Sequence, residues 1–314
     1  MLRFLKMARA VFMGTPEFAV PVLEALHGSH QVVGVYTRPD EAGGRGLRPA
    51  PSPVKVVAQR EGLPLFQPGS LKGGDEAARL RELAPEVIVV AAYGLLLPAG
   101  VLRVPPAGCL NVHPSLLPRH RGPSPIAGAI LAGEVETGVS LMLLDEGMDT
   151  GPLLAQEKLP IEPADTALSL GGKLSHLGAR LLLEVLPRHL KGETRPFAQE
   201  GEPSYTRLIR KEEGQMDWRL PARSLWLRVR AFHPWPGTFT SFKGRRLRVL
   251  EAFPHAAAPP LVPGRVRAMG KGAGVETGEG VLELLTVQME GKLPLPIEDF
   301  LRGQRDFVGA VLPG

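Results

Sequence analysis

The start of the chain alternates between strand-like and helix-like stretches, and this alternation limits the fold more than any other feature of the sequence. Residues 8–13 form an apolar run that ends at Gly14, and residues 31–37 form a second run of the same kind. The stretch between them predicts a helix, whose inner face carries Ala19, Val22, Leu23 and Leu26. Two strands joined by a helix pair in parallel, with the helix packed on the sheet. The sequence therefore predicts an α/β fold built on a parallel sheet.

The turn after the first strand lacks the common signatures of nucleotide binding. Gly14 does not open a Gly-x-Gly-x-x-Gly fingerprint, so a tight strand-to-helix turn is the better interpretation. The long connection at residues 38–53 lacks the Gly-Lys-Ser/Thr of a phosphate-binding loop. Its glycines and its arginines Arg38, Arg45 and Arg48 suit contact with phosphate, but a solvated surface loop explains the same composition. Both interpretations stay open at this point.

Helices and strands continue to alternate along the next hundred residues. Helices are predicted at residues 54–61, 75–83, 126–131 and 166–186, and strands at 87–91, 108–112, 138–144 and 153–159. The last of these strands is expected at an antiparallel edge of the sheet. Pro187 is expected to end the long helix, because proline lacks the N–H that continues the hydrogen-bond ladder.

A second domain is predicted after a break near residue 190. Residues 191–205 are polar and interrupted by glycine and proline, which is typical of a linker. Short strand-like runs follow at 247–250, 264–268 and 280–288, with helices expected at 225–232 and 300–311. Short strands separated by glycine-containing turns favour a small β-barrel. We therefore expect a first domain at residues 1–190, a linker at 191–205 and a barrel domain at 206–314.

The single cysteine and the first residues of the chain favour a cytoplasmic protein. Cys109 has no partner for a disulfide, and we expect it to be a small core residue rather than a nucleophile. Residues 1–6 are too short and too charged for a signal peptide. Apolar runs also stay well below the ~18 residues of a membrane-spanning helix.

Three polar residues form the strongest candidate for a catalytic site. Asn111 and His113 are two residues apart at the end of a predicted strand, so their side chains point to the same face. Asp149 follows His113 by 36 residues, after another predicted strand. Taken alone, a histidine at a strand end is usually a structural residue, and an asparagine there is usually a turn or cap residue. The eight histidines and one cysteine show no spacing typical of a metal site.

The chain resembles the folate-dependent formyltransferases in these residues and in several other segments. The matching segments are residues 13–19 (Met-Gly-Thr-Pro-Glu-Phe-Ala), Ser115-Leu116-Leu117-Pro118, the Asp149 segment, residues 229–237 and residues 294–300. Pro114 departs from the glycine that many relatives carry between the histidine and Ser-Leu-Leu-Pro, which affects only the local backbone. The resemblance implies a Rossmann-like first domain and an OB-like barrel. It also implies that Asn111, His113 and Asp149 are catalytic, that 10-formyltetrahydrofolate is the co-substrate, and that no metal takes part.

Formyl transfer gives each of the three residues a chemical task. An amine attacks the formyl carbon, charge develops on the formyl oxygen, and a proton moves from the amine to the leaving nitrogen. Asn111 and His113 would donate hydrogen bonds to that oxygen, and Asp149 would assist the proton transfer. The resemblance further implies a folate-binding set of Ser115, Leu116, Leu117, Pro118, Tyr93, Leu95, Leu97, Asp145 and Met148.

The amine acceptor is predicted from charge and from the loop at residues 38–53. Residues 205–250 include 11 basic and three acidic residues, an excess of positive charge larger than the +5 of the whole chain. Segregated positive charge is typical of nucleic-acid binding, although a solvated basic surface explains it as well. In the resembled family, members that act on initiator methionyl-tRNA carry a loop like that of Arg45. The resemblance thus implies a tRNA partner, with Arg45, Arg48, Arg245 and Arg246 as contacts.

Two other functions remain open from the sequence. One is formyl transfer to a sugar nucleotide or another small amine, which would use the same three residues. The other is a non-catalytic tRNA-binding protein that keeps the fold. A monomer is expected by default.

Overall fold

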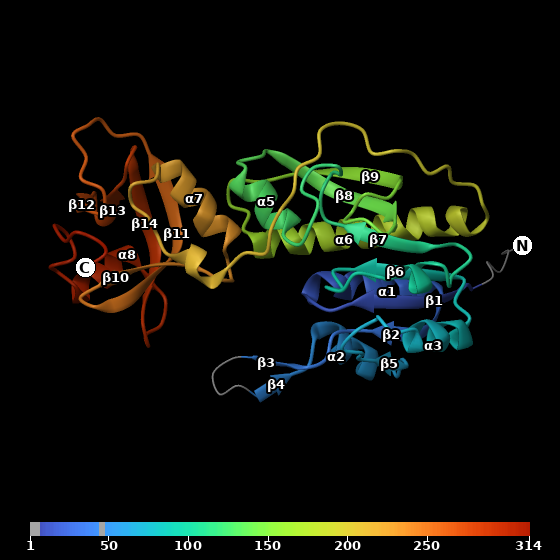
Figure 1. Ribbon diagram of the computed structural model, residues 1–314. Helices are drawn as coiled ribbons and strands as arrows, with labels where there is room; N and C mark the ends of the chain where they lie inside the picture. Colours follow the sequence, from blue (N-terminus) through green and yellow to red (C-terminus); the bar gives the residue numbers. More distant parts are fainter. Residues whose placement is uncertain (1–6, 44–47) are drawn as a thin grey trace, which may run out of the picture. The chain divides into compact units, whose positions relative to one another are not determined.

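The computed structural model describes residues 7–43 and 48–314, and the chain divides into two compact units (Figure 1). The first unit consists of Met1–Pro125, Glu136–Pro160 and Gly171–Thr206. The second consists of Ile126–Val135, Ile161–Leu170 and Arg207–Gly314. Two short segments that precede the predicted linker therefore group with the second unit.

The first unit is built on a seven-stranded sheet in the order β5-β2-β1-β6-β7-β8-β9. Its strands are β1 (Arg9–Gly14), β2 (Gln31–Tyr36), β5 (Leu65–Phe66), β6 (Val87–Ala91), β7 (Cys109–His113), β8 (Glu136–Leu143) and β9 (Leu153–Pro160). The first five strands pair in parallel, whereas β8 is antiparallel to both β7 and β9. The predicted α/β fold with a mostly parallel sheet is confirmed, including the antiparallel edge strand.

The sheet positions the site because its strand order reverses at β1. This strand lies between β2 and β6, and open α/β sheets bind ligands at such a point, beyond the carboxyl ends of the strands. Gly14 ends β1 in the predicted tight turn, since a Cβ there would lie 2.7 Å from the Cβ of Ala19. His113 ends β7 at the same edge of the sheet.

Helices cover both faces of this sheet (Figure 1). They are α1 (Val20–Ser29), α2 (Pro53–Arg60), α3 (Asp75–Leu83), α4 (Ala99–Leu102) and most of α6 (Ala167–Leu190), with a 3-10 turn at Glu17–Ala19. Helix α5 (Pro125–Leu131) belongs almost entirely to a segment that groups with the second unit. Residues of α3 and α4 share an apolar cluster with Cys109. On the other face, Gly178 of α6 lies so close to Val112 that a Cβ would come within 2.5 Å of it. Asn111 and His113 therefore point away from α6, because neighbours in a strand alternate between faces.

Two local expectations about the first unit are wrong. Helix α6 continues through Pro187 to Leu190. A proline in the last turn removes only one ladder bond, and the helix ends three residues later in any case. The connection at residues 38–53 is not wholly irregular either. Its backbone forms a short antiparallel hairpin of β3 (Glu41–Gly43) and β4 (Arg48–Ala50).

The second unit contains an antiparallel sheet in the order β10-β11-β14-β13-β12, with β15 paired to β14. Its strands are β10 (Thr238–Phe242), β11 (Arg245–His255), β12 (Val266–Met269), β13 (Gly272–Glu276), β14 (Val281–Met289) and β15 (Leu295–Pro296). Its helices are α7 (Ala222–Ala231) and α8 (Ile297–Gly303), with a 3-10 turn at Lys211–Gly214. The three predicted strands correspond to β11, β12 and β14. The helix expected at 300–311 is α8 instead, which begins earlier and ends at Gly303.

Strands β10 and β13 escaped prediction for different reasons. Residues 272–276 read Gly-Ala-Gly-Val-Glu, a composition with little strand propensity, so tertiary pairing rather than local preference makes β13 a strand. Residues 238–242 do alternate between buried and partly exposed positions, a signal for β10 that was present in Thr-Phe-Thr-Ser-Phe. Within the described residues, the helices are all too short or too polar to cross a lipid bilayer.

Cys109 is expected to resist thiol reagents until the protein unfolds. Its side chain is 2% exposed, and burial raises the pKa of the thiol to about 12. The thiolate is the reactive form, so a maleimide should label the native protein at least tenfold more slowly than the protein in denaturant. Timed labelling followed by mass spectrometry measures this directly. Equal rates in both states would contradict the buried position of Cys109.

Candidate active site

Asn111 and His113 lie within the last three residues of β7, at its carboxyl end, and both are buried. Asn111 is 9% exposed and His113 is 4% exposed. They pair in register with Met142 and Ser140 of β8, which fixes the strand on its antiparallel side. Among the described residues, the side-chain amide of Asn111 has no hydrogen-bond partner. The amide atoms keep some solvent exposure, so the amide is accessible and is a candidate ligand contact.

Asp149 meets His113 from the loop that follows β8. Its Oδ1 lies 3.7 Å from Nδ1 of His113, and its Oδ2 accepts a hydrogen bond of 2.8 Å from the backbone N–H of Gly122. Asp149 has a φ of 54°, in the left-handed region that non-glycine residues rarely adopt. Such backbone strain persists only where neighbouring contacts hold it, and it is common at functional sites. The three residues predicted to be catalytic thus include a pair in direct proximity.

The hydrogen bond of His113 to a backbone carbonyl defines the tautomer of its neutral imidazole. Its Nε2 lies 3.2 Å from the carbonyl oxygen of His120. A carbonyl oxygen only accepts, so Nε2 carries the proton and Nδ1, which faces Asp149, has a lone pair. Burial lowers the pKa of His113, an effect that the charge of Asp149 and the His120 carbonyl only partly offset. His113 is therefore neutral near pH 7 and can take up a proton at Nδ1 beside a carboxylate that stabilises the product.

Ser115–Pro118 is held by two polar side chains that sequence analysis did not single out. Ser140 Oγ donates to the carbonyl of Ser115 (2.6 Å) and accepts from the backbone N–H of Leu117 (3.0 Å). Gln156 Nε2 donates to the carbonyl of Leu117 (2.9 Å) and to Ser140 Oγ (2.8 Å). In the sequence, the only sign of this role was a polar residue, Ser140, inside the otherwise apolar run 138–144. The Ser115 hydroxyl itself donates to the carbonyl of Arg119 (2.7 Å), so it stabilises the segment from within.

The other sequence-predicted folate residues fall into two groups. Tyr93 and Leu97 are buried in the apolar cluster below the sheet edge, and Leu95 packs against that cluster. Their segment is tied to the end of β1, because Thr15 Oγ1 donates to the carbonyl of Tyr93 (3.0 Å). Asp145 and Met148 lie on the exposed loop before Asp149, where Asp145 accepts from Thr150 Oγ1 (2.7 Å). Met148 is 48% exposed and free to contact a ligand.

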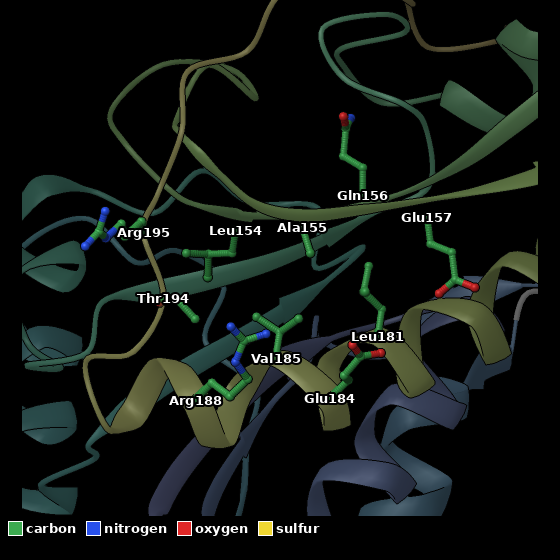
Figure 2. A pocket seen from close by; sticks show the side chains of 10 residues that line it. All are labelled: Leu154, Ala155, Gln156, Glu157, Leu181, Glu184, Val185, Arg188, Thr194 and Arg195. Atoms are coloured by element: carbon green, nitrogen blue, oxygen red, sulfur yellow. The ribbon is translucent and has the colours of Figure 1, made fainter.

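A hollow of about 380 Å³ in the first unit is separate from these residues (Figure 2). It lies between β9 and the second half of α6, and Arg188, Thr194 and Arg195 line its rim. Figure 2 shows that the side chain of Gln156 points away from the hollow. That direction agrees with its bonds to Leu117 and Ser140 on the other side of β9. Since Asn111, His113 and Asp149 do not line it, the hollow is not the candidate active site.

Residues predicted to contact tRNA are described only in part. Arg45 lies outside the described residues, and the backbone of Arg48 belongs to β4. Arg245 and Arg246 are exposed at the start of β11, where Arg245 donates to the carbonyl of Glu290 (2.7 Å). The guanidinium of Arg246 lies 4.3 Å from the ring centre of Phe239 on β10. Within the described residues, no group of three or more His, Cys, Asp or Glu side chains is arranged to hold a metal ion.

Acidification below pH 7 is expected to destabilise the fold. Burial is the largest cause of a lowered pKa at His30, His113 and His120 alike. The unfolded chain, with ordinary histidine pKa values of about 6.5, then binds protons more readily than the folded state. The stability from these neutral histidines is full above that value and is lost as the pH falls through the lower folded pKa values.

Thermal melts between pH 8 and pH 5 measure this effect. The melting temperature should fall as the pH drops from 7 to 5, a range above the main titration of ordinary carboxylates. Replacing His30 by glutamine, far from the catalytic residues, should flatten the slope. A melting temperature that stayed constant or rose on acidification would contradict the expected sign.

The fold and the site together define a class of protein. A parallel α/β sheet presents a donor amide, a neutral buried imidazole and a carboxylate at its carboxyl edge, as an acid–base group-transfer enzyme requires. Residues 7–186 match the formyl transferase family, and residues 208–305 match the formyl transferase C-terminal domain. The chain belongs to the formyl transferase family, and it is an enzyme of that kind.

Known relatives resemble this chain along nearly its whole length. The methionyl-tRNA formyltransferase of Thermus thermophilus is 50% identical over 296 residues, which are 94% of this chain and 96% of the relative. That of Dehalococcoides mccartyi is 46% identical over 307 residues, covering 97% and 98%. Among solved structures, HypX from Aquifex aeolicus in complex with tetrahydrofolic acid has a TM-score of 0.63 at 21% identity, covering 94% of this chain and 47% of that one. An N-formyltransferase from Helicobacter canadensis has a TM-score of 0.65 at 17% identity, covering 90% and 99%.

Proposed function

We propose that this enzyme transfers the formyl group of 10-formyltetrahydrofolate to the amino group of methionine on charged initiator tRNA, for translation initiation. The relatives named for formylation of methionyl-tRNA match it at 45–50% identity over nearly the full chain, which supports this acceptor. The observation that carries the chemistry is the approach of Asp149 to within 3.7 Å of the buried His113 beside Asn111. We further propose that the enzyme acts as a cytoplasmic monomer.

The three residues supply what direct attack by an amine requires. A new bond forms between the amine nitrogen and the formyl carbon, and the bond from that carbon to the folate nitrogen breaks. The unpartnered amide of Asn111 donates to the formyl oxygen as charge develops there. Neutral His113 takes the amine proton at Nδ1, and the imidazolium then donates to the same oxygen before it passes the proton to the leaving nitrogen. Asp149 orients the ring and stabilises its charged form.

The folate site is proposed along the Ser115–Pro118 segment. When bound there, 10-formyltetrahydrofolate supplies the formyl group to the edge at which Asn111 and His113 lie. Ser140 and Gln156 fix the backbone of this segment, so it is pre-formed rather than assembled around the ligand. The proposed walls include Leu116, Leu117, Pro118, Leu95, Leu97, Asp145 and Met148, with Tyr93 in support behind them because it is buried.

The acceptor surface is proposed on the basic residues of the C-terminal part. We assign residues 1–190 to catalysis, 191–205 to a linker and 206–314 to tRNA binding, with Arg45, Arg48, Arg245 and Arg246 as contacts. Some of the basic residues between 205 and 250 are used internally: Arg207 pairs with Glu213, Arg219 with Asp217 and Lys243 with Asp306. Arg230 is buried and donates to the carbonyls of Asp165 and Glu162. The remaining arginines and Lys211 support a positive surface smaller than the sequence count implies.

A sugar-nucleotide amine is the second candidate acceptor, because sugar N-formyltransferases share this fold at 16–17% identity. The test is transfer of labelled formyl from 10-formyltetrahydrofolate to charged initiator tRNA, charged elongator methionine tRNA or an amino-sugar nucleotide. Transfer confined to the initiator tRNA is the expected result. Transfer to the sugar nucleotide alone would replace the proposed acceptor and leave the chemistry intact. Release of formate without transfer would overturn the proposal as a whole.

A further inference from the structure

The segment that follows α6, residues 191–206, is hydrogen-bonded to the rest of the first unit at several points. Phe197 and Leu153 of β9 exchange backbone hydrogen bonds of 2.9 Å and 2.8 Å. Further on, the backbone N–H of Arg121 donates to the carbonyl of Ser204 (2.9 Å), and that of Thr206 donates to the carbonyl of Arg121 (2.7 Å). In Figure 1 this segment is the long irregular trace that follows α6. It is therefore anchored on both sides of residue 199.

Gln199 lies between these anchors and uses its whole side-chain amide to join two loops. Its Nε2 donates to the carbonyl oxygens of Asp149 (2.8 Å) and Gly151 (2.9 Å). Its Oε1 accepts from Nε (3.1 Å) and Nη2 (2.7 Å) of Arg121. Carbonyl oxygens only accept and a guanidinium only donates, so these four contacts allow a single orientation of the amide. Arg121 Nη1 also donates to the hydroxyl of Tyr205 (3.2 Å), which limits its movement.

Gln199 and its partner Arg121 each connect to Asp149 by a separate route. Gln199 holds the backbone of Asp149 at the point where φ is 54°. Arg121 precedes Gly122, whose N–H donates to the Asp149 carboxylate (2.8 Å). A strained backbone needs contacts that fix it, and a carboxylate positioned by one N–H moves with the loop that carries that N–H. Gln199 thus constrains Asp149 through its own carbonyl and through the loop that orients its carboxylate.

We propose that Gln199 is a positioning residue that sets the distance from Asp149 to His113, an inference that rests on the proposed catalytic role of Asp149. Among the described residues, the side-chain hydrogen bonds of Gln199 join it to two backbone carbonyls and to Arg121, so its route to the reaction is through Asp149. The segment predicted as a linker is in this respect part of the support of the active site. A displacement of this segment would therefore change the distance between Asp149 and His113.

Two substitutions separate the contacts of Gln199. Gln199→Met keeps the side-chain length and loses all four hydrogen bonds. Gln199→Glu keeps the acceptor for Arg121 but sets an oxygen against the carbonyls of Asp149 and Gly151. Glu200→Gln is the matched control, because Glu200 is the next residue, is exposed and has no hydrogen bond or ion pair among the described residues.

The measurements are kcat, the KM for the folate donor and the pH dependence of kcat/KM in the full-length enzyme with charged initiator tRNA. Both Gln199 variants should lower kcat by roughly ten- to hundredfold, as expected when a reacting group is misplaced by about 1 Å, and leave the folate KM within about twofold. The charge of Asp149 raises the pKa of His113, so its displacement should also move the acid limb of the profile to lower pH. Glu200→Gln should behave as wild type. A normal kcat and acid limb in Gln199→Met, or in Gln199→Glu, would overturn the assigned role.

A double-mutant cycle distinguishes this inference from the proposed function beneath it. If Gln199 acts through Asp149, then adding Gln199→Met to Asp149→Asn should cost little beyond the single Asp149 change. Full additivity would refute the coupling. A wild-type rate in Asp149→Asn would instead refute the role of Asp149 itself, whereas an inactive Asp149→Asn beside a wild-type Gln199→Met would refute only the role of Gln199. Single-turnover measurements with excess enzyme allow the rates of the slow variants to be determined.

Discussion

Replacing His113 by alanine is expected to lower kcat for formyl transfer by about 10²–10⁴-fold, the usual contribution of a positioned acid–base group. The variant loses the atom that accepts the amine proton and the donor that forms once the ring is charged. Folate and tRNA binding should change far less than kcat, because the imidazole is buried at the end of β7 and, within the described part of the chain, its hydrogen bond is to the carbonyl of His120. Single-turnover transfer of labelled formyl separates these effects.

Loss of fold is the competing explanation for an inactive His113 variant, and His189→Ala controls for it. His189 is partly buried, and like His113 it donates from Nε2 to a backbone carbonyl, that of Ala107 (2.8 Å), but it lies near the end of α6 and outside the proposed site. Both variants leave a carbonyl without its donor, at a cost of about 1–3 kcal/mol in stability. Only the His113 variant should lose rate. A His113 variant with a near-normal kcat would refute the proposed mechanism.

The shared face of Asn111 and His113 was predictable from strand geometry, whereas the approach of Asp149 to His113 was implied by the resemblance to the formyltransferases. Residues two apart in a strand face the same side. Strand β8 is antiparallel to β7, so it ends beside Cys109 at the amino end of β7, and the loop that follows must fold back to bring Asp149 to His113. The buried runs at 8–13, 87–91 and 108–112 marked the sheet, and the apolar strand at 138–144 led to the loop that carries Asp149. The structure adds the distance, 3.7 Å, and the side of the imidazole that faces the carboxylate.

The supports of the site were not predictable in the same way. Gln156 reaches Leu117 across 39 residues of sequence, and Gln199 reaches Asp149 across 50. Hydrophobic periodicity describes which face of an element is buried, but it carries no information on which polar side chain pairs with which distant carbonyl. Tyr93 lies in the segment that the resemblance assigns to folate binding, and the structure adds that its ring packs into the core.

Asp149→Asn is expected to be the most informative single change, because it removes a charge and leaves the shape of the side chain. The asparagine oxygen can still accept the hydrogen bond from Gly122, so the loop should keep its position. The imidazolium that forms during transfer then lacks its negative neighbour, and kcat should fall on the order of 10²–10³-fold. The acid limb of kcat/KM gives a second signature with a fixed sign. Asp149 raises the pKa of His113, so its neutralisation should lower that pKa further and move the limb to lower pH.

These two signatures separate the roles that a carboxylate can play beside His113. A fall in kcat with the acid limb displaced to lower pH is the result expected when Asp149 stabilises the charged ring. A similar fall with an unmoved acid limb would mean that the carboxylate acts on the amine rather than on His113, and the proposed proton path would have to be redrawn. A normal kcat would leave the 3.7 Å approach of the two side chains without a catalytic purpose. Because burial and the Asp149 charge push the pKa of His113 in opposite directions, the acid limb measures their balance in the working enzyme.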